Sequence, residues 1–299
     1  MPACSGLIGW DRDDHAAALA AYAATVDLLG PDWPRHSDED PKAFFETRFL
    51  PQPPVPALLT GYYEPELSGT LAPSPEFRYP LHSAPPDLSD ARVWHSRAEI
   101  EENSLLRGRE LVWLDSAIEA FLAQVQGSVR VRLAEGGVLR LGFAAKNGHP
   151  YHSIGQELVR RGAVAEANMS ADAIREWCKN HPSSVPALLR HNPSYVFFRV
   201  LELPGSSGPL GSMGRPLTAM RSLAADRAHI PAGAPVWVET DRHGRLMVAQ
   251  DTGSAITGKA RADLFCGSGF EAGKCAGEMR DSGRLVTFLP RKLVAGGKT

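Results

Sequence analysis

Two short segments in the last fifth of the chain carry its strongest indications of fold. Residues 246–253 read Leu-Met-Val-Ala-Gln-Asp-Thr-Gly, and residues 263–269 read Asp-Leu-Phe-Cys-Gly-Ser-Gly. Each contains an apolar run of strand length with glycine close behind it. Similar runs predict further strands over residues 195–201, 235–240 and 285–289. Short strands at this spacing, separated by Gly and Pro turns, favour a closed β-barrel over a parallel α/β sheet.

The middle of the chain predicts a half-buried β-hairpin. Apolar residues and arginines alternate over residues 129–133, a second alternating run covers residues 139–143, and Glu-Gly-Gly lies between them. Ser170 is a predicted helix N-cap. Three- and four-residue apolar spacing predicts helices over residues 11–29, 42–49, 154–161, 171–179 and 185–190.

The composition excludes several classes of protein. The 299 residues are 43% hydrophobic and 22% charged, which excludes disorder over most of the length. The net charge of −2 argues against a nucleic-acid binder that relies on bulk positive charge. No apolar run approaches the roughly 18 residues needed to cross a bilayer. Residues 1–10 lack the features of a signal peptide, so we expect a cytosolic protein or a mature form whose export signal was removed.

The spacing of the cysteines and the absence of common catalytic motifs limit the kinds of metal, cofactor and catalytic site that we expect. Cys4, Cys178, Cys266 and Cys275 are too few for a disulfide scaffold and lack the spacing of zinc ligands. Cys266 and Cys275 could close a small loop in an oxidising compartment or remain as two thiols. No phosphate-binding glycine loop, HExxH helix or GxSxG elbow is present. We therefore expect neither a metal nor a cofactor.

Asp251 and Asp263 are the candidate catalytic residues. Each lies at the edge of an apolar strand pattern, and glycines follow both. Leu264 and Phe265 could desolvate Asp263 and keep it protonated near neutral pH, as a general acid must be. The alternative is that both aspartates cap turns, which is a frequent role of this residue.

Further recognisable sequence blocks follow one another in a fixed order along residues 9–290. Residues 60–65 read Thr-Gly-Tyr-Tyr-Glu-Pro, and the later blocks cover residues 126–131, 147–155, 192–198, 216–226 and 251–277. Together they resemble the MltA family, the membrane-bound lytic murein transglycosylase A enzymes of Gram-negative bacteria, which carry a 3D domain.

The resemblance implies a mainly β fold of two domains with a groove between them. The larger domain would be a double-psi β-barrel built from both chain ends, residues 1–65 and 192–299. The smaller, β-rich domain would be an insertion over residues 66–191.

The resemblance also implies an activity and a set of site residues. The family cleaves the β-1,4 bond between N-acetylmuramic acid and N-acetylglucosamine in peptidoglycan and leaves 1,6-anhydromuramic acid ends, without adding water. Asp263 would be the general acid and base, and Asp251 a second acid in the same cleft. The substrate-binding residues would be Thr60, Tyr62, Tyr63, Gln126, Gly253, Gly267 and Gly269. Because neighbouring strand residues face opposite sides, we do not expect both tyrosines to point into the cleft.

The same resemblance implies a partner, an oligomeric state and a location. We expect the protein to bind peptidoglycan strands and no nucleic acid, and to be a monomer. We expect it in the periplasm at the outer membrane, through a lipid anchor that is removed or absent in this chain. Two alternatives stay open: a polysaccharide-binding barrel without catalysis, and a hydrolase in which Asp263 is the acid and Asp251 activates a water.

Overall fold

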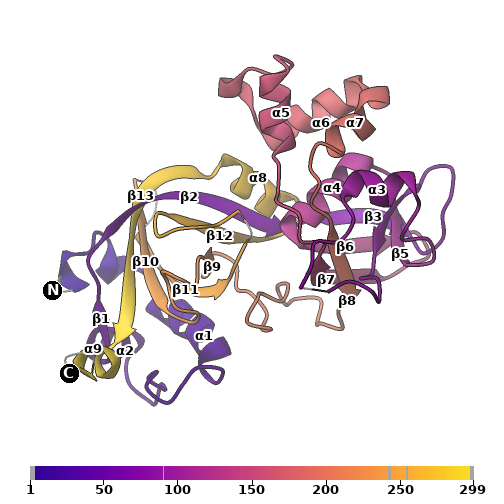
Figure 1. Ribbon diagram of the computed structural model, residues 1–299. Helices are drawn as coiled ribbons and strands as arrows, with labels where there is room; N and C mark the ends of the chain where they lie inside the picture. Colours follow the sequence, from indigo (N-terminus) through magenta and orange to yellow (C-terminus); the bar gives the residue numbers. More distant parts are fainter. Residues whose placement is uncertain (1–3, 90, 242–243, 254, 297–299) are drawn as a thin grey trace. The chain divides into compact units, whose positions relative to one another are not determined.

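The computed structural model describes residues 4–89, 91–241, 244–253 and 255–296, in two compact units (Figure 1). One unit combines the chain up to Tyr63 with the chain from Ser206 onward, and the other runs from Glu64 to Gly205. None of the described helices is long and apolar enough to span a membrane. The predicted two-domain, β-rich fold is confirmed.

The first unit is built on a sheet that closes on itself. Its order is β1-β13-β10-β11-β9-β12-β2, and a further pairing of β13 with β2 closes six of these strands into a barrel. Figure 1 shows β2 and β13 running side by side, in agreement with their antiparallel register. The strands are β1 (Phe49–Pro51), β2 (Val55–Glu64), β9 (Ser222–Ala225), β10 (Pro235–Thr240), β11 (Gly244–Asp251), β12 (Arg261–Ser268) and β13 (Arg280–Pro290).

Strand alternation separates the barrel interior from an outer layer. Every second residue of β12, from Ala262 through Leu264 to Cys266, joins the interior core. Leu246 and Val248 of β11 instead face an outer core rich in aromatic residues. That outer core is completed by the N-terminal helices, where α1 contacts β11. The helices of this unit are α1 (His15–Val26), α2 (Pro41–Arg48), α8 (Phe270–Glu278) and α9 (Arg291–Gly296), with short 3-10 turns at Cys4–Gly6 and Trp10–Arg12.

The second unit is a six-stranded sheet with helices. Its order is β4-β5-β3-β6-β7-β8. The predicted hairpin is confirmed, since Val129 pairs with Leu141 and Val131 with Leu139. Ser170 is confirmed as an N-cap, because its Oγ accepts the Ala173 N–H at 3.1 Å. The strands are β3 (Glu66–Thr70), β4 (Tyr79–His82), β5 (Glu110–Leu114), β6 (Ser128–Leu133), β7 (Val138–Lys146) and β8 (Val196–Val200). The helices are α3 (Arg97–Glu102), α4 (Ala117–Gln126), α5 (Ile154–Arg160), α6 (Ala171–Asn180) and α7 (Val185–Leu189), with 3-10 turns at Glu166–Asn168 and Pro182–Ser184.

The division between the units corrects the expected domain boundary at residue 192. The strand predicted over residues 195–201 forms as β8, but it pairs with β7 of the second unit and not with the barrel. Phe197 and Phe198 are buried in that unit, which gives the physical reason for the pairing. The second unit therefore extends to Gly205 and begins at Glu64 rather than at residue 66.

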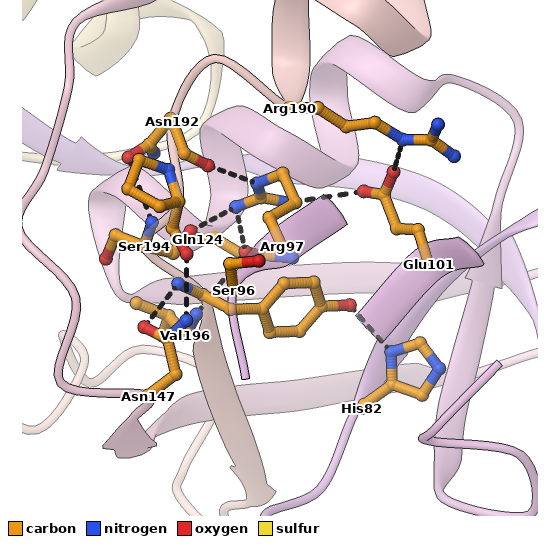
Figure 2. A network of polar contacts seen from close by, with 12 residues as sticks. His82, Ser96, Arg97, Glu101, Gln124, Asn147, Arg190, Asn192, Ser194 and Val196 are labelled. Atoms are coloured by element: carbon orange, nitrogen blue, oxygen red, sulfur yellow. Dashed lines mark hydrogen bonds and ion pairs between the residues drawn. The ribbon is translucent and has the colours of Figure 1, made fainter. Parts of the chain in front are cut away.

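A buried arginine organises the loops of the second unit (Figure 2). The Arg97 guanidinium donates to the Gln124 Oε1 at 2.7 Å, the Ser194 carbonyl at 2.8 Å and the Asn192 carbonyl at 3.2 Å. It also lies over the rings of Phe121 and Tyr195, at 4.7 and 4.8 Å from their centroids. Arg97 thus fixes the segment that leads into β8.

Two neighbouring side chains extend this network. Asn147 donates to the Pro193 carbonyl at 2.8 Å and accepts the Tyr195 N–H at 2.8 Å. The Tyr195 hydroxyl lies 2.9 Å from Nδ1 of His82. Burial lowers the pKa of His82 to about 4, so this histidine is neutral at pH 7. The sequence blocks 147–155 and 192–198 are therefore held together by polar contacts inside the second unit.

We expect Arg97→Met to destabilise the second unit by about 3 kcal/mol or more, because it leaves several buried acceptors without donors. Arg190→Met is the control: it removes a partly exposed ion pair to Glu101 and should cost less than about 1 kcal/mol. The measurement is urea unfolding of both variants. Equal midpoints for the two variants would show that the Arg97 network does not stabilise this unit.

Candidate active site

The two candidate aspartates lie level with each other on the barrel. β9 is flanked by β11 on one side and β12 on the other. Ala224 of β9 pairs with Asp251 of β11 and with Asp263 of β12. Two strand spacings separate the aspartate backbones by about 10 Å. Pairing of both strands with Ala224 therefore places Asp251 and Asp263 at the same level of the barrel.

A β-bulge decides which face of the barrel Asp251 occupies. Met247 and Ala249 of β11 belong to the interior core, so strict alternation would place Asp251 in the interior as well. The register instead shifts between Ala249 and Asp251. Gln250 donates from Nε2 to the Ala21 carbonyl at 2.7 Å and thus faces the outer layer. Asp251, the next residue, is directed to the outer face by the bulge.

Asp263 contacts one hydroxyl and one cation. The Thr60 hydroxyl on β2 donates to Oδ1 of Asp263. Nη2 of Arg261 lies 3.7 Å from the same oxygen and 3.3 Å from Oγ1 of Thr60. The Asp263 side chain is 17% exposed. Burial raises the pKa of Asp263 above the ordinary value of an aspartate, and Thr60 and Arg261 oppose this rise only in part.

The carboxyl group of Asp251 accepts more hydrogen bonds than that of Asp263. Its Oδ1 accepts the N–H groups of Ser212 and Thr252, at 2.8 and 2.9 Å. Its Oδ2 accepts the hydroxyl of Tyr62 at 2.8 Å. Burial raises the pKa of Asp251 above the ordinary value of an aspartate, and these hydrogen bonds oppose this rise only in part. Both oxygens of this carboxyl group are thus occupied by protein donors.

The adjacent tyrosines face opposite sides of β2, as strand alternation predicts. Tyr62 reaches Asp251, and its ring lies 5.4 Å from that of Phe265, centroid to centroid. Burial and the negative charges of Asp251 and Asp263 hold the pKa of Tyr62 well above its ordinary value. Tyr63 instead packs against the interior core, beside Gly273. Tyr62 thus joins the aspartates on the outer face, and Tyr63 joins the interior core.

The other predicted site residues are more widely distributed. Gly253 follows Asp251 in the loop after β11, next to Ile256. Gly267 lies in β12 with φ +120°, a conformation that favours glycine, and Gly269 is the N-cap of α8. Gln126 is the last residue of α4 and belongs to the second unit, whereas both aspartates belong to the first.

Close approach of β2 to α8 requires a glycine at position 61. A Cβ atom there would lie 2.7 Å from Cα of Ala276 and 2.9 Å from Sγ of Cys266. This contact brings the strand that carries Thr60 and Tyr62 against α8. A larger residue at position 61 would displace that strand and the two hydroxyl groups.

The structure also identifies contacts that the sequence did not reveal. Arg261 precedes Asp263 by two residues, so strand alternation could have placed both on one face. Ser212 contacts Asp251 through its backbone N–H, which leaves no signal in the sequence. Asp226, within the 216–226 block, accepts the Gly258 N–H at 2.7 Å and so secures the loop between the two aspartates.

Comparisons with known proteins identify the family. Residues 58–199 match the MltA specific insert domain, and residues 221–289 match the 3D domain. A crystal structure of membrane-bound lytic murein transglycosylase from Agrobacterium tumefaciens is 31% identical, with 99% of this chain and 98% of that chain aligned at a TM-score of 0.87. The chain belongs to the MltA family.

MltA of Escherichia coli is similar in both sequence and structure. Membrane-bound lytic murein transglycosylase A of Escherichia coli K12 is 38% identical over 240 residues, which cover 76% of this chain and 64% of that protein. The chain thus spans just under two thirds of the length of this curated MltA relative. A structure of E. coli MltA with bound chitohexaose is 34% identical and covers 79% of this chain and 72% of that one, with a TM-score of 0.72.

Cys266 and Cys275 are free thiols in the structure, and both side chains pack in the interior core of the barrel. Cys266 lies in β12 and Cys275 in α8. In a sample purified without reductant, we expect them to form a disulfide, because the two side chains pack together in one core. Intact mass should fall by two hydrogens, and Cys275→Ser should abolish the change. Full alkylation of both thiols in the unfolded, unreduced protein would contradict this expectation.

Proposed function

We propose that this protein is a peptidoglycan lytic transglycosylase. Its substrate is the β-1,4 bond between N-acetylmuramic acid and N-acetylglucosamine, and its product carries a 1,6-anhydromuramic acid end. The observation that carries the proposal is the pair Asp251 and Asp263 on one barrel face, with burial favouring the protonated form of Asp263. The names of the MltA relatives support the same reaction.

In the first step, Asp263 acts as the general acid. Its proton passes to the glycosidic oxygen, and the bond between that oxygen and the anomeric carbon breaks with its electron pair going to the oxygen. Positive charge develops at the anomeric carbon, as in other glycosidic cleavages. Asp263 becomes a carboxylate, which the Thr60 hydroxyl and Arg261 stabilise.

In the second step, the same residue acts as the general base. The C6 hydroxyl of the muramoyl residue attacks its own anomeric carbon, and its proton passes to the Asp263 carboxylate. Because the nucleophile is tethered, correct orientation can supply about 7–11 kcal/mol of the barrier reduction. Asp263 ends the cycle protonated, and no water enters the product.

Asp251 has a different role in this proposal. Its two oxygens already accept the Tyr62 hydroxyl and two backbone N–H groups, so it is poorly placed to activate a water molecule. A fixed negative charge near the anomeric carbon would instead stabilise the developing positive charge. This arrangement favours the transglycosylase over the hydrolase.

The substrate contacts are proposed from the same face. Tyr62 offers an aromatic ring beside Phe265, and sugar ring carbons pack well on such surfaces. Gly253, Gly267 and Gly269 would let the backbone approach a glycan strand closely. Thr60 contributes through Asp263, while Tyr63 packs against the interior core and Gln126 lies in the second unit.

The proposed setting is the cell envelope. The relatives are named as membrane-bound enzymes, and a structure of one of them holds chitohexaose. We propose that this chain likewise acts on glycan strands, as a monomer in the periplasm associated with the outer membrane. A barrel that binds polysaccharide without cleaving it is the competing function, and it predicts binding without turnover.

We expect Asp263→Asn to lower turnover of purified peptidoglycan about 10²–10⁴-fold, the usual contribution of general acid–base catalysis. The amide keeps the shape but cannot donate and retrieve a proton. Glycan binding should persist, because the other contacts remain. Asp251→Asn should lose less activity, since its Oδ1 still accepts the backbone N–H groups of Ser212 and Thr252. The assay quantifies anhydromuropeptides released per unit time.

Asp172→Asn is the control, because that side chain is 93% exposed and lies in the second unit. It should match the unchanged protein. An active Asp263→Asn variant beside an inactive Asp251→Asn variant would reverse the two roles. Full activity in both would remove this site from the reaction, and binding without turnover by the unchanged protein would establish the competing function.

A further inference from the structure

Arg261, Thr60 and Asp263 form a continuous chain of polar contacts on the outer face of the barrel. Arg261 and Asp263 are two residues apart on β12 and therefore share a face. Thr60 lies on β2, the neighbour of β12 in the sheet. Nη2 of Arg261 donates to Oγ1 of Thr60 at 3.3 Å, and Thr60 donates to Oδ1 of Asp263.

The chemistry of the guanidinium fixes the direction of the first hydrogen bond, and the contact between Thr60 and Asp263 gives the second. A guanidinium group has donors and no acceptor, so the Thr60 oxygen must accept from Arg261. A threonine hydroxyl has one proton, and here that proton points to Oδ1 of Asp263. As long as Thr60 donates to it, Oδ1 is an acceptor in either protonation state of Asp263. When the carboxyl group is protonated, its own proton is on Oδ2.

We propose that Arg261 and Thr60 are positioning residues that make Oδ2 of Asp263 the atom that carries the catalytic proton. This inference rests on the proposed function, because it assigns a role within the same proton transfer. The proton leaves Oδ2 for the glycosidic oxygen, and the proton of the C6 hydroxyl returns to Oδ2. Oδ1 remains bound to Thr60 throughout.

The geometry distinguishes the chain of contacts from Arg261 through Thr60 to Asp263, here called the relay, from an ordinary surface ion pair. The Arg261 guanidinium is 3.7 Å from Oδ1, beyond hydrogen-bond distance, and the Thr60 hydroxyl bridges the two groups. Nε of Arg261 is buried and has no hydrogen-bond partner among the residues that the structure describes. A pair selected for stability alone would place two guanidinium N–H groups directly on the carboxylate.

The other ionisable groups around Asp263 are engaged elsewhere. The Tyr62 hydroxyl donates to Asp251, and Asp251 accepts two backbone N–H groups on its other oxygen. The Cys266 thiol lies 3.6 Å from the Leu264 carbonyl. Within the described parts of the chain, Thr60 is therefore the side chain that hydrogen-bonds to Asp263, and Arg261 is the cation beside it.

The test compares kcat and KM on soluble glycan strands as a function of pH for three single variants and one double variant. Thr60→Val removes the hydroxyl at constant shape, Thr60→Ser keeps it, and Arg261→Met removes the guanidinium but keeps an apolar stem. We expect Thr60→Val and Arg261→Met each to lower kcat about 10–100-fold with little change in KM, a part of the contribution of acid–base catalysis. Thr60→Ser should stay within about threefold of the unchanged protein.

The pH profile supplies a second readout. Activity requires protonated Asp263, so the rate falls as pH rises through the pKa of this residue. Thr60 and Arg261 both lower that pKa, so their loss should move the alkaline limb to higher pH. The double variant should lose no more than about the larger single loss, because the two residues act as one unit.

Arg284→Met is the matched control. It removes another barrel arginine, one paired with Glu239 at 2.6 Å on the β10–β13 side, and should leave kcat and the pH profile unchanged. Thermal unfolding checks that each variant is folded. If Arg261→Met does not fold, Arg261→Lys, which keeps a cationic donor, takes its place and should retain the alkaline limb within experimental error.

Three outcomes would overturn the relay. They are a fully active Thr60→Val variant, a Thr60→Ser variant as impaired as Thr60→Val, and multiplicative losses in the double variant. These failures are separable from failure of the proposed function. An inactive Asp263→Asn variant beside unaffected relay variants removes only the relay, whereas an active Asp263→Asn variant removes the proposed function itself.

Discussion

The shared register of β11 and β12 on Ala224 is the constraint on which the site depends. β9 is only four residues long, yet it fixes the level of Asp251 through a parallel pairing and that of Asp263 through an antiparallel one. Closure of the barrel then brings β2 beside β12 and adds Thr60. A shift of one residue in either pairing would turn one aspartate to the opposite face.

The bulge after Ala249 adds what register alone cannot supply. It allows Gln250 to bond to α1 while the next residue, Asp251, turns to the face of Asp263. The two carboxyl groups then differ in surroundings. Asp251 is fixed by donors on both oxygens, and Asp263 keeps one oxygen free of protein contacts among the residues described. In the proposed function, that difference gives Asp251 an electrostatic role and Asp263 the proton-carrying role.

Much of this arrangement could be predicted from sequence, because alternation and turn residues act locally. The hairpin over residues 129–143 and the opposite orientation of Tyr62 and Tyr63 follow from a period of two. The sheet to which residues 196–200 belong could not be predicted, since an apolar strand pattern does not show which strand it pairs with. The bulge and the backbone contact from Ser212 also leave no local signal.

The origin of the atoms in the product tests the account most directly. If Asp263 donates its proton to the leaving sugar and accepts the proton of the C6 hydroxyl, no solvent oxygen enters the newly formed glycan end. Digestion of purified peptidoglycan in water enriched in heavy oxygen, followed by mass spectrometry, measures this. The account predicts anhydro ends without label. Reducing ends that carry heavy oxygen would contradict it and would identify the protein as a hydrolase.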